Sequence, residues 1–282
     1  MARRQTLSYC AEQVRRLDPD RYYCTLFAPA ARREALFALY AFNAEVARAR
    51  ESVSEPALGQ IRLQWWREAI AGIYERAPPR HQVVTALAGA VAGGALARHD
   101  FDRLIDARER DFDDAPPESL AALEDYAEGT SAALVALALS ALGVAGDAAR
   151  AAGRHVGIAW ALSGLLRAVP FHARARRLYL PADVMAAEGV DGDDVLALKR
   201  PQGLAGVVAA VATVAADHLR AARALGREVP RAALPALLPA SLAGADLARL
   251  RRARFDVFDA GVAAGGVGRK LRAAANAALG RF

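Results

Sequence analysis

Apolar side chains recur every three or four residues along most of this chain, which is the spacing of one face of a helix. In residues 56–74, for example, Ile61, Trp65, Ala69 and Ile73 fall on one side of a helix. Similar patterns predict helices over residues 35–51, 83–97, 120–126, 161–168 and 206–227, and one or two more within residues 248–282. No stretch alternates polar with β-branched residues as a half-buried strand does. The pattern therefore predicts an all-α protein.

Two stretches carry almost no charge, residues 130–146 and residues 203–216. Asp147 ends the first and Asp217 ends the second, so each is shorter than the roughly 20 apolar residues that a membrane-spanning helix needs. We interpret both as buried helices of the core. A proline at position 170 is expected to kink or end the helix in which it falls.

The composition indicates a globular chain and limits its partners. Hydrophobic residues make up 54% and charged residues 24%, enough for a sizeable core, and no repeat or linker divides residues 1–282, which we expect to form a single domain. The net charge is +6 and the cations are mostly arginine, which prefers planar anions such as carboxylates and phosphates. Codon bias alone also produces such a composition. No nucleic-acid module is present, so anionic lipids and diphosphates are the expected classes of anion.

The two cysteines predict a reducing compartment, and residues 1–4 with those that follow predict no targeting signal. Cys10 and Cys24 are not spaced as a metal pair, and no disulfide framework is expected. Residues 1–4 are basic but no apolar segment follows them, so no secretory signal is predicted. We expect a cytoplasmic protein, with a peripheral position at the inner face of the membrane left open.

Two segments turn from apolar to polar along their length, which predicts helices with one end in the core and the other in a cavity. The first, residues 35–51, places Tyr40, Asn43, Ala47 and Glu51 on one helical face. The second, residues 161–181, becomes strongly basic. Its candidate ligand-binding side chains are Arg167, His172, Arg174, Arg176, Arg177 and Tyr179.

Residues 103–114 hold the densest group of carboxylates, including Asp106, Glu109 and Asp111. Neighbouring carboxylates can share a hard cation, which makes this segment the best metal candidate by composition. Arginines are interleaved with these acids, however, and can neutralise them. A solvated helix face with local ion pairs is the favoured interpretation.

Two short runs resemble the squalene/phytoene synthase family. Residues 38–42 (Ala-Leu-Tyr-Ala-Phe) are similar to the run that leads into that family's first aspartate-rich motif, and residues 177–181 (Arg-Leu-Tyr-Leu-Pro) to the signature after its second. The resemblance implies a helical bundle of the isoprenoid (trans-prenyl) synthase type around a central cavity, where prenyl diphosphates are condensed head to head. It implies Mg²⁺ held by two carboxylate motifs, and it makes Asp111 a cavity-lining candidate.

Most of the metal-binding carboxylates implied by this resemblance are absent. The first motif's positions are occupied by Ala47, Arg48 and Glu51, and those of the second by Ala168 and His172. Near the N-terminus, Asp20 and Arg21 stand where the family has a Ser-Phe pair facing the substrate. We therefore expect no metal cofactor and assign no catalytic residue, with Mg²⁺ belonging only to the alternative of an active synthase.

A narrower resemblance is to the squalene/phytoene-synthase-like assembly factors of mitochondrial respiratory complex I. It is carried, in order along the chain, by residues 45–48, 52–55, 64–66, 78–79, 81–82, 126–128, 170–172 and 255–258. It implies a non-catalytic protein that supports assembly of complex I (NADH dehydrogenase), with complex I subunits or assembly intermediates as partners.

Two hypotheses follow. In the first, a non-catalytic protein keeps the synthase cavity and binds a prenyl diphosphate or another anionic lipid through its basic cluster; in the second, it is an active prenyltransferase with unconventional metal ligands. The missing carboxylates favour the first. In both, Tyr40, Asn43, Glu51, Arg167 and His172 are expected to line one cavity. If side chains fill that cavity instead, the arginines are merely solvated.

Overall fold

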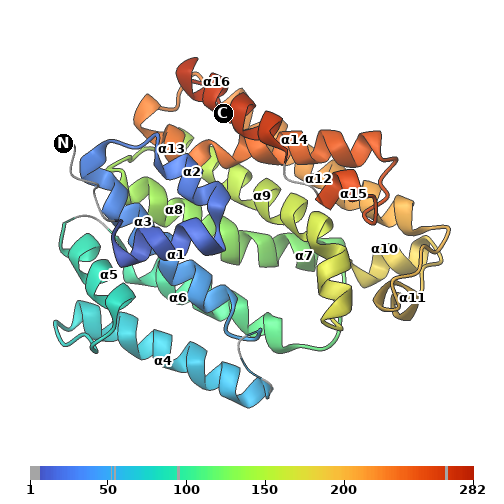
Figure 1. Cartoon of the computed structure of the whole chain (residues 1–282), viewed down its shortest axis with the longest axis horizontal. Coiled ribbons are helices and arrows are strands. Elements are labelled where there is room, and N and C mark those ends of the chain that lie inside the picture. The colour runs from blue at the N-terminus through green and yellow to red at the C-terminus, as the bar shows by residue number, and fades with distance from the viewer. Residues whose placement is uncertain (1–6, 52, 54, 94–95, 264–265) are drawn as a thin grey trace.

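The computed structural model describes residues 7–51, 53, 55–93, 96–263 and 266–282, and within these ranges it contains helices and loops but no strand (Figure 1). In chain order the elements are α1 (Tyr9–Leu17), α2 (Pro19–Thr25), α3 (Ala30–Ala47), α4 (Pro56–Tyr74), α5 (Gln82–Ala92), α6 (Arg98–Ala107), the 3₁₀ helix η1 (Arg108–Phe112), α7 (Leu120–Ala127), the π-helical η2 (Glu128–Ala132), α8 (Ala133–Ala141), α9 (Asp147–Arg174), α10 (Ala182–Ala187), α11 (Gly192–Leu196), α12 (Leu204–Ala224), the 3₁₀ helix η3 (Arg231–Ala233), α13 (Leu234–Leu237), α14 (Pro239–Arg252), α15 (Ala260–Ala263) and α16 (Val267–Ala278). The predicted all-α class is confirmed.

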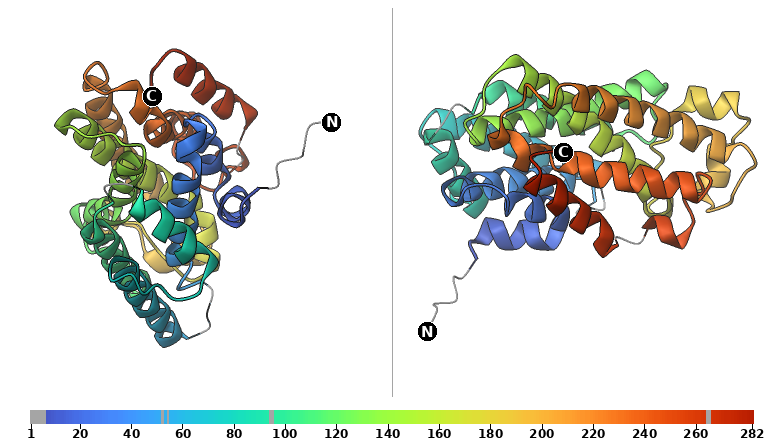
Figure 2. Two further views of the ribbon diagram at one scale, coloured as in Figure 1. Left: turned by 90° about the vertical axis from the view of Figure 1, so that its left-hand side faces the viewer. Right: turned by 90° about the horizontal axis from the view of Figure 1, so that it is seen from above.

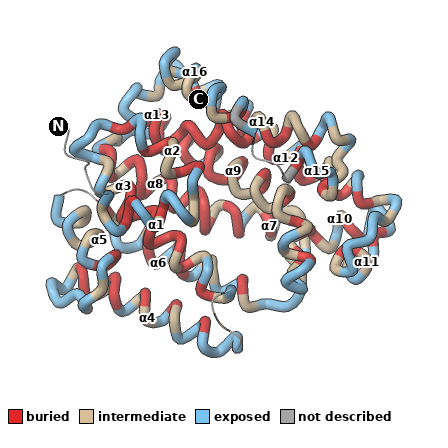
Figure 3. Tube along the Cα trace, in the orientation of Figure 1, coloured by how far each residue is buried: buried red, intermediate tan, exposed pale blue. Residues whose placement is uncertain are grey.

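The bundle is built around α9, the longest helix, which packs against α7, α8, α12 and α14. Small residues let its neighbours approach closely. A Cβ atom at Gly157 would lie 2.4 Å from the Cα atom of Ala132, so only glycine permits this crossing with η2. Buried residues concentrate on the central helices, while α4 and α16 are exposed along their outer sides (Figure 3).

The predicted helices are present, but several of their ends differ from expectation. The helix predicted over residues 83–97 ends at Ala92, and the one predicted over residues 206–227 spans Leu204–Ala224. The helix predicted over residues 35–51 begins earlier, at Ala30, and ends at Ala47. Pro170 does not end α9, which continues to Arg174. A proline removes one backbone donor from a helix, and the packing of α9 on both sides offsets that loss.

Two helices, α9 and α12, have the length and hydropathy of a membrane span. Of their most apolar windows, 56% of the residues in α9 and 44% of those in α12 are buried inside the protein. These two helices also pack against each other. A core helix of a soluble bundle meets the same criteria, so the feature is weak evidence for membrane insertion.

Candidate ligand-binding cavity

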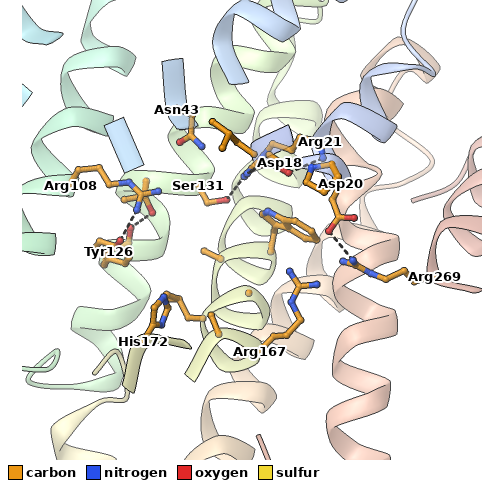
Figure 4. A pocket seen from close by; sticks show the side chains of 18 of the residues that line it. Asp18, Asp20, Arg21, Asn43, Arg108, Tyr126, Ser131, Arg167, His172 and Arg269 are labelled. Atoms are coloured by element: carbon orange, nitrogen blue, oxygen red, sulfur yellow. Dashed lines mark hydrogen bonds and ion pairs between the residues drawn. The ribbon is translucent and has the colours of Figure 1, made fainter. Parts of the chain in front are cut away.

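A cavity of about 630 Å³ with many charged side chains in its lining opens between α2, α3, α9 and α16 (Figure 4). One face of α9 forms its floor, because Ala161, Gly164, Leu165, Ala168 and His172 follow each other at helical spacing. Most of these side chains are small, and a Cβ atom at Gly164 would meet no other atom within 4 Å. The sequence of α9 therefore leaves this space open.

A neighbouring wall comes from a π-helical turn, η2, which packs against α9 and contributes Thr130 and Ser131 to the cavity lining. Such turns insert one extra residue into a helix and occur often at functional sites. Ser131 accepts a long hydrogen bond of 3.5 Å from the guanidinium of Arg21. The turn thus contributes hydroxyl groups to a wall that is otherwise cationic.

Positive charge dominates the cavity lining. The charged side chains that line it are Arg21, Arg108, Arg167, Arg269, Lys270, Asp18 and Asp20. Five are cationic and two are anionic, so the lining has an excess of positive charge. Such a lining attracts anions and disfavours a free metal cation.

The acids around the cavity hold several of these arginines in place. Arg269 is 5% exposed and donates to Asp20 over 2.8 Å and to Asp246 over 2.9 Å. Arg167 also reaches Asp246, over 3.3 Å, from the other side (Figure 4 shows Arg167 and Arg269 beside Asp20). Burial raises the pKa of Asp246, although the surrounding arginines pull the pKa down. The network orients the guanidinium groups of α9 and α16 along one wall.

A second network of hydrogen bonds surrounds Asp111, which is buried. Its carboxylate accepts from Tyr126 over 2.7 Å, from Tyr179 over 2.8 Å and from Arg108 over 3.3 Å. Burial raises the pKa values of both tyrosines. They therefore stay protonated and act as donors, and both oxygens of Asp111 are used within the protein.

His172 separates the main cavity from an adjoining cavity of about 450 Å³ and lines both. Burial, together with the positive charge of Arg177, lowers its pKa to about 4, so the imidazole is neutral at physiological pH. Its Nδ1 atom is buried and has no hydrogen-bond partner among the described residues. The hydrogen-bonding capacity of this nitrogen is therefore unused among the described residues.

The candidate residues named from the sequence fall into four places, and Tyr40, which was expected to line the shared cavity, is in neither cavity lining. Asn43, Arg167 and His172 line the main cavity, whereas Glu51, Asp111, Arg177 and Tyr179 line the adjoining one with His172. Tyr40 is buried, with the guanidinium of Arg21 5.7 Å from the centre of its ring. Arg174 and Arg176 are exposed and line neither cavity.

The placement of Glu51 differs from the expectation of one shared cavity. Because α3 ends at Ala47, Glu51 follows in a turn, where 47% of its side chain is exposed. Its carboxylate lies 3.9 Å from the guanidinium of Arg48. The helical spacing from Asn43 therefore does not extend to Glu51, and the polar end of the predicted helix is replaced by a turn.

Sequence reasoning missed the cavity cations contributed by the two ends of the chain. Asp18 caps α2, and Asp20 and Arg21 line the cavity, although the sequence singled out this pair only as a departure from the family's Ser-Phe. Arg269 and Lys270 line it from a segment for which the sequence predicted a helix and no role in a site. The one available signal was the unusual Asp-Arg pair where the resemblance implied Ser-Phe.

The described residues do not fit the magnesium ions that the fold implies. They contain no group of three or more His, Cys, Asp or Glu side chains arranged to hold a metal ion. The two carboxylates that line the main cavity are each paired with an arginine, Asp18 with Arg21 and Asp20 with Arg269. Asp111, which lines the adjoining cavity, is bonded by two hydroxyls and a guanidinium. In residues 103–114, Asp106 and Glu109 are both paired with Arg67 at the surface. Magnesium prefers several carboxylate and carbonyl oxygens around one point, and these paired acids do not form such a set.

The architecture is that of the isoprenoid synthases. A crystal structure of a dehydrosqualene synthase in complex with ligand superposes with a TM-score of 0.82 at 17% identity, covering 96% of this chain and 94% of that one. A squalene synthase from Alicyclobacillus acidocaldarius gives 0.78 at 21% identity, covering 87% and 93%. At these identities the likeness shows the fold alone.

The family model described as squalene/phytoene synthase matches residues 14–267, and this chain belongs to that family. It is 36% identical over 250 residues to the Bos taurus protein "NADH dehydrogenase (ubiquinone) complex I, assembly factor 6", covering 89% of this chain and 75% of that one. The Homo sapiens protein of the same name is 35% identical with the same coverage. A presqualene diphosphate synthase of Rhodopseudomonas palustris is 30% identical over 167 residues, which is 58% of each chain. Both resemblances drawn from the sequence are confirmed.

Proposed function

We propose that this protein supports the assembly of respiratory complex I (NADH dehydrogenase) and does not catalyse prenyl transfer. Relatives that match across most of its length carry the name of a complex I assembly factor. The observation that carries the proposal is chemical: Ala47, Arg48, Ala168 and His172 occupy positions where a synthase of this family needs metal-binding carboxylates. The alternative, an active prenyltransferase, has no described metal site to use.

In this proposal the cavity binds an amphiphile with an anionic, phosphate-bearing head and does not turn it over. Arginine forks form charge-assisted hydrogen bonds to phosphate oxygens without an intervening metal ion. The cavity volume of about 630 Å³ lies in the range of small-molecule sites. A prenyl diphosphate and a phospholipid share this head chemistry, and both are candidate ligands. The protein acts near the membrane, on its inner face, with complex I subunits or assembly intermediates as partners.

Deletion of the gene in its own organism tests the assembly role directly. We expect less fully assembled complex I on native gels, with unchanged amounts of the other respiratory complexes. A copy of the full chain should restore the assembled complex. Normal assembly of complex I in the deletion strain would refute the proposed function.

Purified protein should release no pyrophosphate from farnesyl or geranylgeranyl diphosphate, with magnesium or with manganese. The reason is the absence of carboxylates that could neutralise a leaving diphosphate. Magnesium should also leave the melting temperature unchanged, because a cation that binds the folded state would raise it by mass action. Release of pyrophosphate above background would establish the prenyltransferase alternative in its place.

Replacing Arg167 with glutamine should weaken binding of farnesyl diphosphate roughly tenfold, measured by calorimetry at low salt, because one charge-assisted bond is lost. Arg167 is 26% exposed at its side chain and lines the cavity. Arg174→Gln is the matched control, since Arg174 leaves the same helix on the exposed side. Equal losses in both variants would place the anion on the surface cluster instead of in the cavity.

A further inference from the structure

Helix α16 is oriented with its polar side inward. Arg269 is buried against Asp20 and Asp246, Lys270 lines the cavity, and Asn276 donates to Ser241 over 2.7 Å. The same side also packs two alanines, Ala273 and Ala277, against the core. A surface helix of a soluble protein normally buries its large apolar residues as well.

The outward side of the same helix is apolar. Leu271 is 65% exposed, and Leu279, at the C-terminal end of the helix, is 64% exposed. Ala275 lies between them at helical spacing and is also exposed. We call these three residues the α16 stripe. None of the described helices packs over it, and α16 lies at the edge of the molecule in all three views (Figure 2).

Basic side chains border the α16 stripe. Of the four cations in residues 267–282, Arg272 and Arg281 are exposed, and this segment contains no aspartate or glutamate. Arg272 projects beside Leu271 and is exposed. It lies close to Arg223, whose pKa is lowered by burial and by the charge of Arg272. Arg231, from η3, donates to the carbonyl of Ala278 over 3.3 Å.

An aromatic group continues this surface toward the N-terminus. Tyr23 of α2 donates to the carbonyl of Lys270 over 2.9 Å, and the Lys270 ammonium lies 5.7 Å from the centre of its ring. Phe27 packs edge-on against Tyr23 at 5.3 Å and is 38% exposed, beside the exposed Leu26. In both views of Figure 2 the blue N-terminal helices and the dark red C-terminal helix lie on the same face.

We propose that the α16 stripe is a membrane-docking surface that lies in the headgroup region of an anionic bilayer. Two leucines with alanine between them and arginines on either side suit shallow insertion, in which the apolar face enters the interface and the cations meet anionic lipids. The charge of α16 complements such a surface, and a narrow stripe of this kind is too small for the core of a stable protein interface. Only the purpose of this docking, which is to bring the cavity beside the lipids, depends on the proposed function.

Helix α16 lies between the ligand cavity and the docking surface. Arg269 and Lys270 line the cavity, while the next residue, Leu271, faces outward. The helix is therefore the wall between the cavity and the docking surface. A lipid-like ligand would have to pass only one helix to move from the bilayer into the cavity.

The test is binding of the full chain to phosphatidylcholine vesicles with and without phosphatidylglycerol, measured by flotation at low and high salt. Wild-type protein should bind the anionic vesicles only, and the double variant Leu271→Ser/Leu279→Ser should bind them roughly tenfold more weakly. The matched control is Leu58→Ser/Ile61→Ser on α4, where the side chains are 48% and 64% exposed on the opposite side of the molecule (Figure 1). The control should bind as wild type does.

A fluorescent label provides a readout that does not depend on loss of binding. Both native cysteines are buried, so an environment-sensitive dye can be attached to Leu279→Cys, or to Ile61→Cys as the control. On anionic vesicles the emission should shift to the blue at position 279 and not at position 61. Absence of wild-type binding, equal losses in the two double variants, or a shift at position 61 alone would overturn the docking surface. The Leu271→Ser/Leu279→Ser variant should still bind farnesyl diphosphate in calorimetry as wild type does, because neither leucine lines the cavity, and this separates failure of the cavity proposal from failure of this one.

Discussion

Replacing Arg269 with alanine is expected to lower the free energy of unfolding by about 3 kcal/mol or more, the largest stability effect that we predict for a single side chain. The side chain of Arg269 is only 3% exposed and bridges Asp20 on α2 to Asp246 on α14. Its removal leaves Asp246, which is 4% exposed at its side chain, with two longer contacts to Arg167 and Arg249. Burial already raises the pKa of Asp246, and the loss of one cation would raise it further.

Urea denaturation followed by circular dichroism measures this effect. Arg200→Ala is the control: it also removes an arginine from an ion pair between distant segments, but the Arg200 side chain is 61% exposed. Exposed pairs contribute roughly 0–1 kcal/mol, so the control should be nearly neutral. A loss below about 1 kcal/mol for Arg269→Ala would show that water replaces the guanidinium and that the network does not hold the chain ends together.

Acidification from about pH 7 to about pH 4.5 should cost the wild-type protein roughly 2 kcal/mol more stability than it costs a His172→Gln variant. The pKa of His172 is lowered to about 4 in the folded protein by burial and by Arg177, from an ordinary value of 6.5. A histidine with a depressed pKa contributes its full stability above the unfolded value. That contribution is lost as the pH falls from about 6.5 toward about 4, because the unfolded chain takes up the proton first.

The comparison between the two proteins isolates this histidine, since their carboxylates titrate alike. Glutamine keeps a polar side chain of similar reach but does not titrate in this range. The difference in unfolding free energy should therefore open below about pH 6.5 and level off near pH 4. Parallel pH profiles for the two proteins would mean that solvent reaches the imidazole and that its pKa is ordinary.

The presence and approximate positions of the helices were predictable from the sequence, because the apolar residues of an amphipathic helix recur every three or four positions. The helix predicted over residues 56–74 coincides with α4, and the apolar residues 130–146 include the buried helix α8. The ends of helices were less predictable. Nothing in the sequence near Ala47 shows that α3 stops there and turns Glu51 toward solvent.

The residues of the candidate site were likewise predictable only in part. Arg167 and His172 were found from the change from apolar to basic residues, and Asp111 from the family resemblance. The basic cluster, however, predicted the cavity lining only in part. The side chains of Arg174 and Arg176 are exposed, whereas Arg177 donates a hydrogen bond to the hydroxyl of Tyr179. In the turn after α9, helical spacing no longer predicts which way a side chain points, because Arg176 adopts a left-handed backbone conformation with φ of 57°.

The sequence by itself determined that this is an all-α member of a synthase family from which most metal-binding carboxylates have been lost, because both properties depend on which residues occupy neighbouring positions. Only the tertiary structure decided which charges meet around the cavity. Arg269 meets Asp20 across 249 positions of the chain, and the same helix places Lys270 in the cavity and Leu271 outside. Contacts between distant segments depend on how whole helices pack, and no local pattern records which charges will meet.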